Sequence, residues 1–375
     1  MTDKSHPIPV RAAVCRAFGQ PLSIETLTLA PPGPNDVRVD VSACAICHSD
    51  ILFIDGGWGG ELPAVWGHEA AGVVAEVGAH VSRVTVGDQV VVTLIRSCGE
   101  CRSCTRGAPA TCQVQFELDG HSPLTDTGGS PVGHGLRTAA FAEQVVVHES
   151  QVVTVAADIS PEAASLLACG VITGVGSVTN TAAVEAGSSV VVIGAGGVGL
   201  NVIQGARMAG ADPIIVADLV DQKLTDAEAF GATHGVNPAT DDLAARVAEI
   251  TNGGADYVFV AVGAKAAVDG AANMLAPNGA LVLVGIPASG VTTEIDPVTI
   301  ASSNQSILGS KMGGASVDGD IPRLAEAYQN GDLELDALVS RTYPLDQIND
   351  AIDSVRAGEA RRNIIVFEPR TETTA

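Results

Sequence analysis

Four cysteines fall within one short stretch, CGECRSCTRGAPATC, which begins at Cys98. Cys98, Cys101, Cys104 and Cys112 have the spacing C-x2-C-x2-C-x7-C, and four thiolates suit a tetrahedral Zn²⁺ with no position left for substrate. Ferredoxin-type iron–sulfur clusters begin with the same spacing, but their fourth cysteine comes sooner and precedes proline, whereas Gln113 follows Cys112. Free thiols or an oxidised pair would also be compatible with the spacing. The stretch predicts a closed, structural zinc site that carries no catalysis.

Three residues far apart in the sequence could form a second, open metal site. Cys47 lies in ACAICHSD, His68 in WGHEAAG and Cys169 in LLACGVITG. One histidine and two cysteines are a known catalytic zinc set, in which the fourth position stays available for water or substrate. Any one of the three taken alone would more often be a core residue than a ligand, as Cys15 and Cys44 illustrate. Only the fold can bring them together.

A glycine motif, GAGGVG, follows the apolar run SSVVVI and precedes a helical pattern. Gly194, Gly196 and Gly199 would allow a tight turn and let a pyrophosphate approach the positive end of the helix. The next apolar run, PIIVAD, ends in Asp218, where a carboxylate can accept both ribose hydroxyls and would repel a 2′-phosphate. Lys223 could lie over the adenosine ribose or be an ordinary surface lysine. The pattern predicts a dinucleotide site that favours NAD over NADP, and the alternative is a glycine turn that serves only helix–strand packing.

The elements that must position these residues differ along the chain. Up to about residue 165, short β-like runs such as VRVDVSA and AGVVAEVG alternate with turn signals. From about residue 188, apolar runs rich in Val and Ile alternate with helical patterns, as expected of a doubly wound parallel sheet covered on both faces. After about residue 306, two helical patterns, IPRLAEAYQNG and LDQINDAIDSVRAG, precede a final strand, NIIVFE. The fold class predicted is α/β.

Length and composition exclude several classes of function. A chain of 375 residues can form two domains with their own cores, and its formal net charge of −23 disfavours nucleic acid or an anionic membrane as a partner. The start of the chain, MTDKSHPIPVRAAV, lacks the apolar stretch of a signal peptide, and no later segment has the pattern of a membrane span. We therefore expect a cytoplasmic protein, where clustered cysteines bind metals more often than they form disulfides.

Taken in order, the motifs CHSD, GHEAAGVV, the four-cysteine lobe, CGVITGVGS and GAGGVG resemble the zinc-dependent medium-chain alcohol dehydrogenases over essentially the whole chain. The resemblance implies a β-rich, GroES-like catalytic domain formed by residues 1–170 and 306–375, with the structural zinc lobe at residues 98–112. It implies a Rossmann NAD-binding domain at residues 171–305. A small-molecule alcohol or aldehyde is the expected partner, and a homodimer is favoured over a homotetramer because the segment after the lobe is long.

The same resemblance assigns roles around the open site. Cys47, His68 and Cys169 would bind a catalytic Zn²⁺, which makes two zinc ions per chain with the structural one. Glu69 would be a second carboxylate near the metal that can transiently replace water, and Asp50 would fix the tautomer of His68 by a hydrogen bond.

The implied reaction is hydride transfer from a zinc-activated alkoxide to C4 of the nicotinamide of NAD. Ser49 would accept a hydrogen bond from the alcohol and pass its proton towards the cofactor ribose. Further cofactor contacts follow from the resemblance, with packing roles as the alternative for those on the nicotinamide side. They are His48 and Arg362 at the pyrophosphate, Gly197 in the glycine loop, and Thr173, Val198, Val284 and Ile286 beside the nicotinamide.

The sequence departs from the family pattern at two positions. Liver-type members carry a relay histidine five residues after the cysteine that corresponds to Cys47, and Leu52 stands there. Glutathione-dependent formaldehyde dehydrogenases carry an arginine three residues after the last lobe cysteine, and Gln115 stands there. A thiol-adduct formaldehyde dehydrogenase, using glutathione or mycothiol, is therefore the alternative function, together with a nicotinoprotein alcohol dehydrogenase that never releases its NAD.

Two side chains fall where the family lines its substrate channel. An aromatic wall from Trp58 with Leu94 as its aliphatic partner would favour a medium-sized apolar primary alcohol, benzylic or allylic. Trp58 lies in the glycine-rich stretch GGWGG, so a role in covering the core is an equally weighted alternative.

Overall fold

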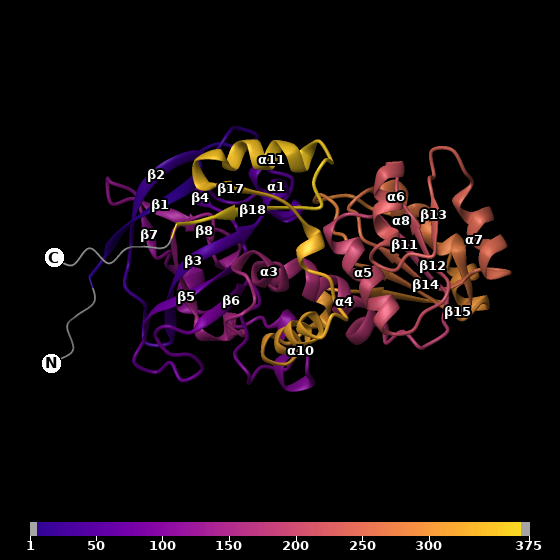
Figure 1. The fold of residues 1–375 in the computed structure, drawn as a ribbon, viewed down its shortest axis with the longest axis horizontal. Coiled ribbons are helices and arrows are strands. Elements are labelled where there is room, and N and C mark those ends of the chain that lie inside the picture. Colours follow the sequence, from indigo (N-terminus) through magenta and orange to yellow (C-terminus); the bar gives the residue numbers. More distant parts are fainter. Residues whose placement is uncertain (1–5, 369–375) are drawn as a thin grey trace. The chain divides into compact units, whose positions relative to one another are not determined.

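The computed structural model describes residues 6–368, and these form two compact units. The first unit comprises residues 6–169, 316–331 and 335–368, and the second comprises residues 170–315 and 332–334. Figure 1 shows the first unit with the indigo, purple and yellow parts of the chain and the second with the pink and orange parts. Both ends of the sequence therefore contribute to the first unit. Residues 1–5, which open the stretch used above to exclude a signal peptide, lie outside the described residues.

The first unit is built on two groups of strands. A closed barrel runs in the order β1 (Ile8–Cys15), β2 (Ser23–Leu29), β7 (Leu124–Thr125), β8 (Pro131–His134) and β4 (Ala64–Val65). A larger sheet runs in the order β10 (Val152–Thr154), β6 (Gln89–Thr93), β5 (Glu69–Val77), β3 (Asp36–Ala45), β18 (Arg362–Val366) and β17 (Val339–Pro344), and β9 (Gln144–His148) also pairs with β3. Because β18 pairs with β3, the C-terminal strand lies beside the N-terminal part of the chain.

Helices in the N-terminal part of the first unit are short, as the turn-rich sequence indicates, and a longer one, α10 (Val317–Gln329), comes from the C-terminal part. The other helices are α1 (His48–Ile54), α2 (Glu117–Gly120), α3 (Pro161–Leu166) and α11 (Ile348–Arg356). One hydrophobic core, to which apolar residues of β1, β3, β5 and β9 contribute, supports the barrel and the sheet together. Such a core can hold residues from distant parts of the sequence at fixed positions.

The second unit contains a six-stranded parallel sheet. Its order is β13 (His234–Val236), β12 (Ile214–Ala217), β11 (Val190–Ile193), β14 (Ala255–Val260), β15 (Leu275–Leu283) and β16 (Ser306–Gly309), and every neighbouring pair is parallel. The helices are α4 (Ile172–Gly176), α5 (Gly197–Met208), α6 (Asp221–Glu228), α7 (Leu243–Thr251), α8 (Lys265–Ala271) and α9 (Pro297–Ser302). This order, with the first strand at the centre and the chain wound outwards in both directions, is the doubly wound dinucleotide-binding order. The predicted doubly wound parallel sheet is confirmed.

The predicted domain boundaries differ from the structure at Gly170 and residues 332–334, which belong to the second unit, and most at residues 306–315. Residues 306–315 were expected in the catalytic domain, but Ser306–Gly309 forms β16 and pairs with β15 along its whole length. The second unit therefore continues to residue 315. A four-residue edge strand carries little sequence signal, because the side chains SILG are only partly covered.

One segment of the described residues, Pro161–Ala182, has the length and composition that a membrane span requires. In this protein 89% of that apolar stretch is buried inside the molecule, as expected of a core helix. It combines α3 and α4 with π-helical turns at Leu167–Val171 and Ser177–Ala182. The segment that carries Cys169 is therefore an internal one.

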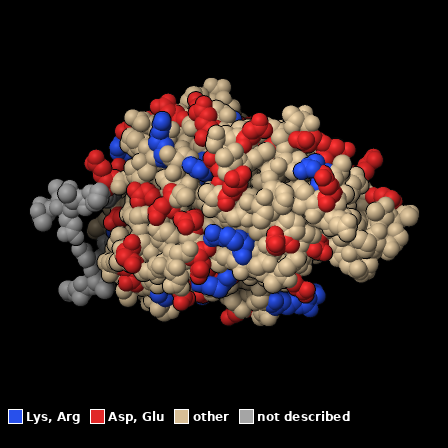
Figure 2. Space-filling view, turned by 45° about the vertical axis from the view of Figure 1, so that its right-hand side comes forward, with Lys and Arg blue, Asp and Glu red and all other residues tan. Residues whose placement is uncertain are grey.

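The surface reflects the excess of acidic residues, 43 Asp and Glu against 20 Lys and Arg. Figure 2 shows acidic side chains spread over the visible face, with smaller groups of basic ones between them. A surface of this kind repels polyanions over distances comparable to the Debye length.

Candidate metal centres and active site

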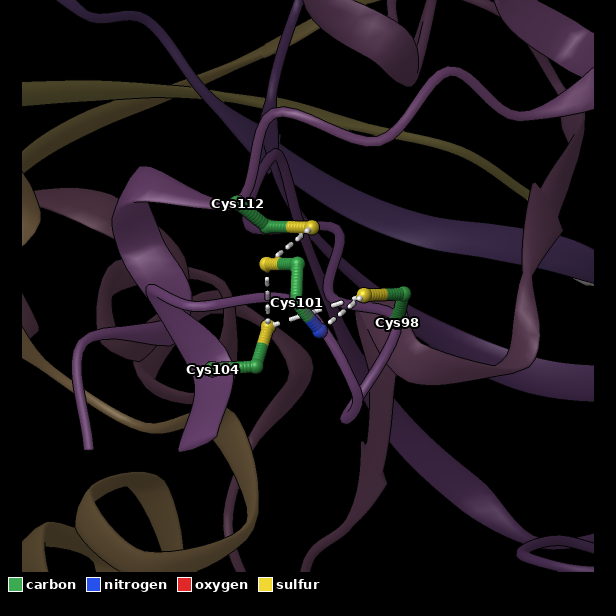
Figure 3. Close-up of side chains that lie close together, drawn as sticks. All are labelled: Cys98, Cys101, Cys104 and Cys112. Carbon is green, nitrogen blue, oxygen red and sulfur yellow. Dashed lines mark hydrogen bonds between the residues drawn. The ribbon is translucent and has the colours of Figure 1, made fainter. Parts of the chain in front are cut away.

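The four lobe cysteines converge, as Figure 3 shows. The Sγ atoms of Cys101 and Cys104 are 3.5 Å apart, those of Cys101 and Cys112 are 3.8 Å apart, and those of Cys98 and Cys104 are 3.9 Å apart. No disulfide joins any of the eight cysteines, all of which lie in the described residues. The four sulfurs converge because the chain makes a tight turn after Cys98 and two 3₁₀ turns, Cys104–Arg106 and Pro109–Thr111.

The sulfur positions fit zinc. Zn–S bonds of about 2.3 Å place two sulfurs of a regular tetrahedron about 3.8 Å apart, which matches the three observed distances. An iron–sulfur cubane would hold its four thiolates farther apart, because the cluster itself lies between them. Amide and thiol hydrogen bonds, the amide of Cys104 first, lower the pKa of Cys101 to about 6, so this ligand is a thiolate at neutral pH.

A buried arginine beside the lobe was not singled out from the sequence. Arg96 is 1% exposed and its guanidinium lies 3.0 Å from Asp119 and 2.8 Å from the Gln151 side chain. It also lies over the ring of Phe116. Arg96, which follows β6, thus connects the segment after Cys112, through Asp119, to the Gln151 side chain.

The second cluster brings together the open-site residues. The ligand atoms of Cys47, His68, Glu69 and Cys169 all lie within 4.8 Å of one another, and all four side chains are buried. Cys47 precedes α1, and Cys169 lies in the π-helical turn Leu167–Val171. Glu69 begins β5, and His68 directly precedes it. Local π-helical geometry is frequent at functional sites, because it points a side chain in a direction that a regular helix does not allow.

Asp50 holds two of these residues in place, as the sequence predicted for one of them. Its Oδ1 lies 2.9 Å from His68 Nδ1 and accepts the backbone N–H of Gly67 at 3.0 Å. Its Oδ2 accepts the backbone N–H of Cys47 at 2.9 Å. A carboxylate on Nδ1 keeps the proton there and leaves Nε2 for a metal, and Nε2 is indeed buried without a hydrogen bond within the described residues.

The Cys169 turn is fixed by a residue that sequence reasoning did not identify. Thr93, fully buried at the end of β6, donates its hydroxyl hydrogen bond to the carbonyl of Ala168 at 2.6 Å. The two residues are 75 positions apart, so no local pattern could have paired them. Thr93 therefore anchors the backbone immediately before the third ligand.

Arg362 occupies a different environment from a surface pyrophosphate contact. It is 5% exposed, its Nη1 lies 3.0 Å from Glu69 Oε1, and it also donates to the carbonyl of Ile46 at 3.3 Å. Burial raises the pKa of Glu69 to about 8, although the Arg362 charge opposes this. Arg362 thus contacts the buried Glu69 side chain directly, and its predicted contact with the pyrophosphate stays a prediction.

The two thiols of this cluster shift each other's pKa in opposite directions, downward for Cys47 and upward for Cys169. A hydrogen bond from Cys169, followed by the charges of His68 and Arg362, lowers the pKa of Cys47 well below its usual value, despite burial. Burial alone would lower the pKa of His68, but the Asp50 carboxylate raises it well above the usual value. A divalent cation would replace these protons, because thiolate and neutral imidazole are the forms that bind metal. The chemistry of two sulfurs and one imidazole nitrogen fits Zn²⁺ with an open fourth position.

The remaining predicted residues of the first unit lie on α1, in the loop after it, and after β6. Ser49 and His48 are on α1, Ser49 half-buried and His48 exposed, and Leu52 is half-buried on the same helix. Leu94 directly follows β6, and Trp58 lies in the glycine loop after α1; both are half-buried. The substrate roles of Trp58 and Leu94 stay predictions.

The glycine loop of the second unit has the shape that a phosphate site needs. Gly194 has φ +101°, and a Cβ on Gly199 would lie 1.7 Å from the Gly194 carbonyl oxygen, so no larger residue fits there. Gly196 precedes α5, which Gly197 begins. A Cβ on Gly196 would meet nothing within 4 Å, so the space next to the first turn of α5 is open. The N–H groups of that turn could bind a phosphate there.

Asp218, at the end of β12, lies beside this loop. Its Oδ2 accepts the N–H of Ala195 at 2.9 Å, and its Oδ1 accepts the N–H of Val220 at 3.1 Å. The other predicted cofactor residues of this unit differ in exposure: Thr173 and Val284 are buried, Val198 and Lys223 are half-buried, and Ile286 is 57% exposed. Their contacts with a cofactor stay predictions.

Comparison with known proteins places the chain in a family. Residues 33–157 match the family model described as the alcohol dehydrogenase GroES-like domain, and residues 197–330 match the model described as zinc-binding dehydrogenase. The first match confirms the GroES-like architecture of the first unit. The second match, which covers most of the second unit, is to a family described as zinc-binding.

Relatives match over nearly the full length. S-(hydroxymethyl)glutathione dehydrogenase from Paracoccus denitrificans is 35% identical and covers 95% of this chain and 99% of its own. The solved structure of an alcohol dehydrogenase zinc-binding domain protein from Burkholderia ambifaria is 35% identical with a TM-score of 0.93, covering 97% of this chain and 100% of its own. That of benzyl alcohol dehydrogenase from Acinetobacter calcoaceticus is 33% identical with a TM-score of 0.90, covering 96% and 100%. With these matches and both cysteine-containing clusters assembled, the chain belongs to the zinc-dependent medium-chain alcohol dehydrogenase family and is an oxidoreductase that acts on alcohols.

Proposed function

We propose that the protein uses NAD and zinc to interconvert a primary alcohol bearing a flat apolar group, benzylic or allylic, with its aldehyde. The buried set Cys47, His68 and Cys169 carries this proposal, because it offers a Cys₂His zinc site with an open position. The half-buried Trp58 supports the flat apolar group. Similarity to the benzyl alcohol dehydrogenase of Acinetobacter calcoaceticus supports the same class of substrate.

The side chains of the first unit would bind the metal, orient its ligands and accept the proton of the alcohol. Zinc held by Cys47, His68 and Cys169 would act as a Lewis acid that lowers the pKa of an alcohol and polarises an aldehyde carbonyl. Asp50 would keep the His68 ring oriented through the 2.9 Å contact with Nδ1. Ser49, two residues after Cys47, would accept the alcohol proton. Leu52 cannot pass that proton on, so it would leave through the cofactor ribose or through water.

NAD would bind to the glycine loop of the second unit, with its adenosine ribose at Asp218. Replacing Asp218 by glycine removes the carboxylate and is expected to lower kcat/KM with NAD by about tenfold to a hundredfold, since hydrogen bonds to a charged group contribute about 1.5–3 kcal/mol. Activity with NADP should fall less or rise, because the repulsion of a 2′-phosphate is gone. The measurement is the NAD/NADP ratio of kcat/KM, with Asp241→Asn, an exposed aspartate of the same unit, as the control. An unchanged ratio in Asp218→Gly would contradict the ribose assignment.

A second candidate is oxidation of a thiol–formaldehyde adduct, favoured by the 35% identity to S-(hydroxymethyl)glutathione dehydrogenase. Gln115 argues against it, because an amide cannot form the charged pair with a carboxylate that an arginine forms. The test is NAD reduction by the zinc-loaded protein with primary aliphatic, benzylic and allylic alcohols in the absence of thiol. Turnover that favours the bulkier apolar alcohols supports the proposal. Turnover only with formaldehyde and a thiol supports the adduct enzyme, and NAD that copurifies and does not exchange indicates a nicotinoprotein.

A further inference from the structure

Both tryptophans of the chain lie against one phenylalanine. Phe53, near the end of α1, stacks on Trp66 with ring centroids 4.6 Å apart and an interplanar angle of 19°. The ring of Trp58 meets the same phenylalanine edge to face at 5.1 Å and 80°. The protein has only 2 Trp, 3 Tyr and 7 Phe in 375 residues, so three of its twelve aromatic rings gather at this one place. All three residues belong to the first unit.

The two ends of this stack differ in how they are held. Trp66 is 4% exposed and directly precedes Gly67 and His68, so its backbone is continuous with the candidate metal ligands. Trp58 is half-buried and lies in a loop with three left-handed glycines. Gly59 has φ +72° and Gly60 has φ +123°, conformations that glycine adopts without strain. These glycines allow the tight turns of the loop that carries Trp58.

The loop also closes over the rings. A Cβ on Gly60 would lie 3.5 Å from Cη2 of Trp66 and 4.0 Å from Cδ1 of Phe53, so the backbone of Gly60 packs on both. Gly57 donates to the carbonyl of Leu52 at 2.7 Å, which ties the start of the loop to α1. Phe53 thus stands between the buried indole of Trp66, next to the candidate ligands, and the half-buried indole of Trp58 in the loop.

We propose that Phe53 is a positioning residue for substrate selection: it holds the indole of Trp58 in a fixed orientation against the Trp66 stack, so that Trp58 forms a flat apolar wall. This inference rests on the proposed function, which makes Trp58 a substrate contact. Edge-to-face and stacked pairs contribute beyond their buried area, and they fix the mutual orientation of the rings. An indole that can reorient would discriminate poorly between alcohols. An indole held in one orientation favours binding of a substrate with a planar group.

The experiment is a double-mutant cycle on Phe53→Leu and Trp58→Leu, with kcat/KM measured for benzyl alcohol and for ethanol. Phe53→Leu is expected to lower kcat/KM for benzyl alcohol about tenfold, mostly through a higher KM, and to leave ethanol within about twofold. Trp58→Leu should do the same. The double variant should lose no more than either single one, because Phe53 acts through Trp58. Phe53→Tyr, which keeps the ring, should restore the benzyl preference.

A structural role alone would give another pattern. Phe367→Leu is the matched control, since Phe367 is also half-buried and packs against the same hydrophobic core. It should leave the alcohol preference and the near-ultraviolet circular dichroism of the tryptophans unchanged, whereas Phe53→Leu should change both. If Phe53→Leu does not fold, Phe53→Met fills the same space without a ring and replaces it in the cycle.

The outcomes separate the role of Phe53 from the proposed function. Losses that add in the double variant, or an unchanged benzyl preference in Phe53→Leu while Trp58→Leu loses it, would overturn the role of Phe53 and leave the proposed function intact. A wild-type protein without benzyl preference, together with an inert Trp58→Leu, would overturn both.

Discussion

Replacing Cys169 by serine is expected to reduce alcohol-dependent NAD reduction by about 10³-fold or more. A serine hydroxyl is a poor zinc ligand, and the Lewis-acid contribution of a bound metal amounts to several kcal/mol of the barrier. Zinc content should fall from two ions per chain to one. NAD binding should be retained, because the glycine loop and Asp218 belong to the second unit.

The matched control for this variant is Cys44→Ala. Cys44 is also a fully buried cysteine of the first unit, but it belongs to neither metal cluster. It should keep two zinc ions and most of the activity. Near-normal turnover of Cys169→Ser would remove Cys169 from the metal site, and loss of NAD binding would show that the substitution had disturbed the fold instead.

Replacing Cys101 by serine is expected to lower the stability of the protein more than its catalytic rate. Cys101 is in contact with the sulfurs of both Cys104 and Cys112, so its loss opens the closed site. Binding free energy of a structural zinc contributes to folding, and a loss of several kcal/mol would lower Tm by about 10 °C in a chain of this size. Differential scanning calorimetry and zinc analysis on the same sample measure both effects.

Ser103 provides the control inside the lobe, since it lies between two of the ligands and is not one of them. Ser103→Ala should keep both zinc ions and a Tm close to that of the wild type. A Cys101→Ser protein that is folded, retains two zinc ions and melts normally would contradict a structural role for the lobe.

Local patterns in the sequence were enough for some parts of the site. The lobe cysteines lie within one turn-rich stretch, so their convergence could be read from spacing, and the sulfur distances agree with it. Gly194 and Gly199 are required by the backbone itself, one by a positive φ and the other by a close carbonyl. Asp50, by contrast, is assigned to His68 through the family resemblance alone, and its hydrogen bond from the backbone N–H of Cys47 emerges only from the structure.

Other parts depend on contacts between distant segments. Thr93 supports the Cys169 turn across 75 residues, and Arg362 reaches Glu69 only because β18 pairs with β3. No periodicity or motif indicates such contacts. Phe53 could not be identified for a related reason: an aromatic residue at the end of a short amphipathic helix usually packs in the core, and only the stack with Trp66 gives it a further role.

The central claim is that alcohol oxidation depends on a metal at Cys47, His68 and Cys169, and that the lobe metal is not needed for the chemistry. Removing zinc with a chelator tests this most directly, when zinc per chain, Tm and NAD reduction with benzyl alcohol are followed in the same sample. The open site offers three protein ligands and the lobe offers four thiolates, so the open site should release its zinc first. The account predicts that activity falls to zero as zinc falls from two ions per chain to one, with little change in Tm, and that added zinc restores it. Full turnover with one zinc ion per chain, or with none, would contradict the account.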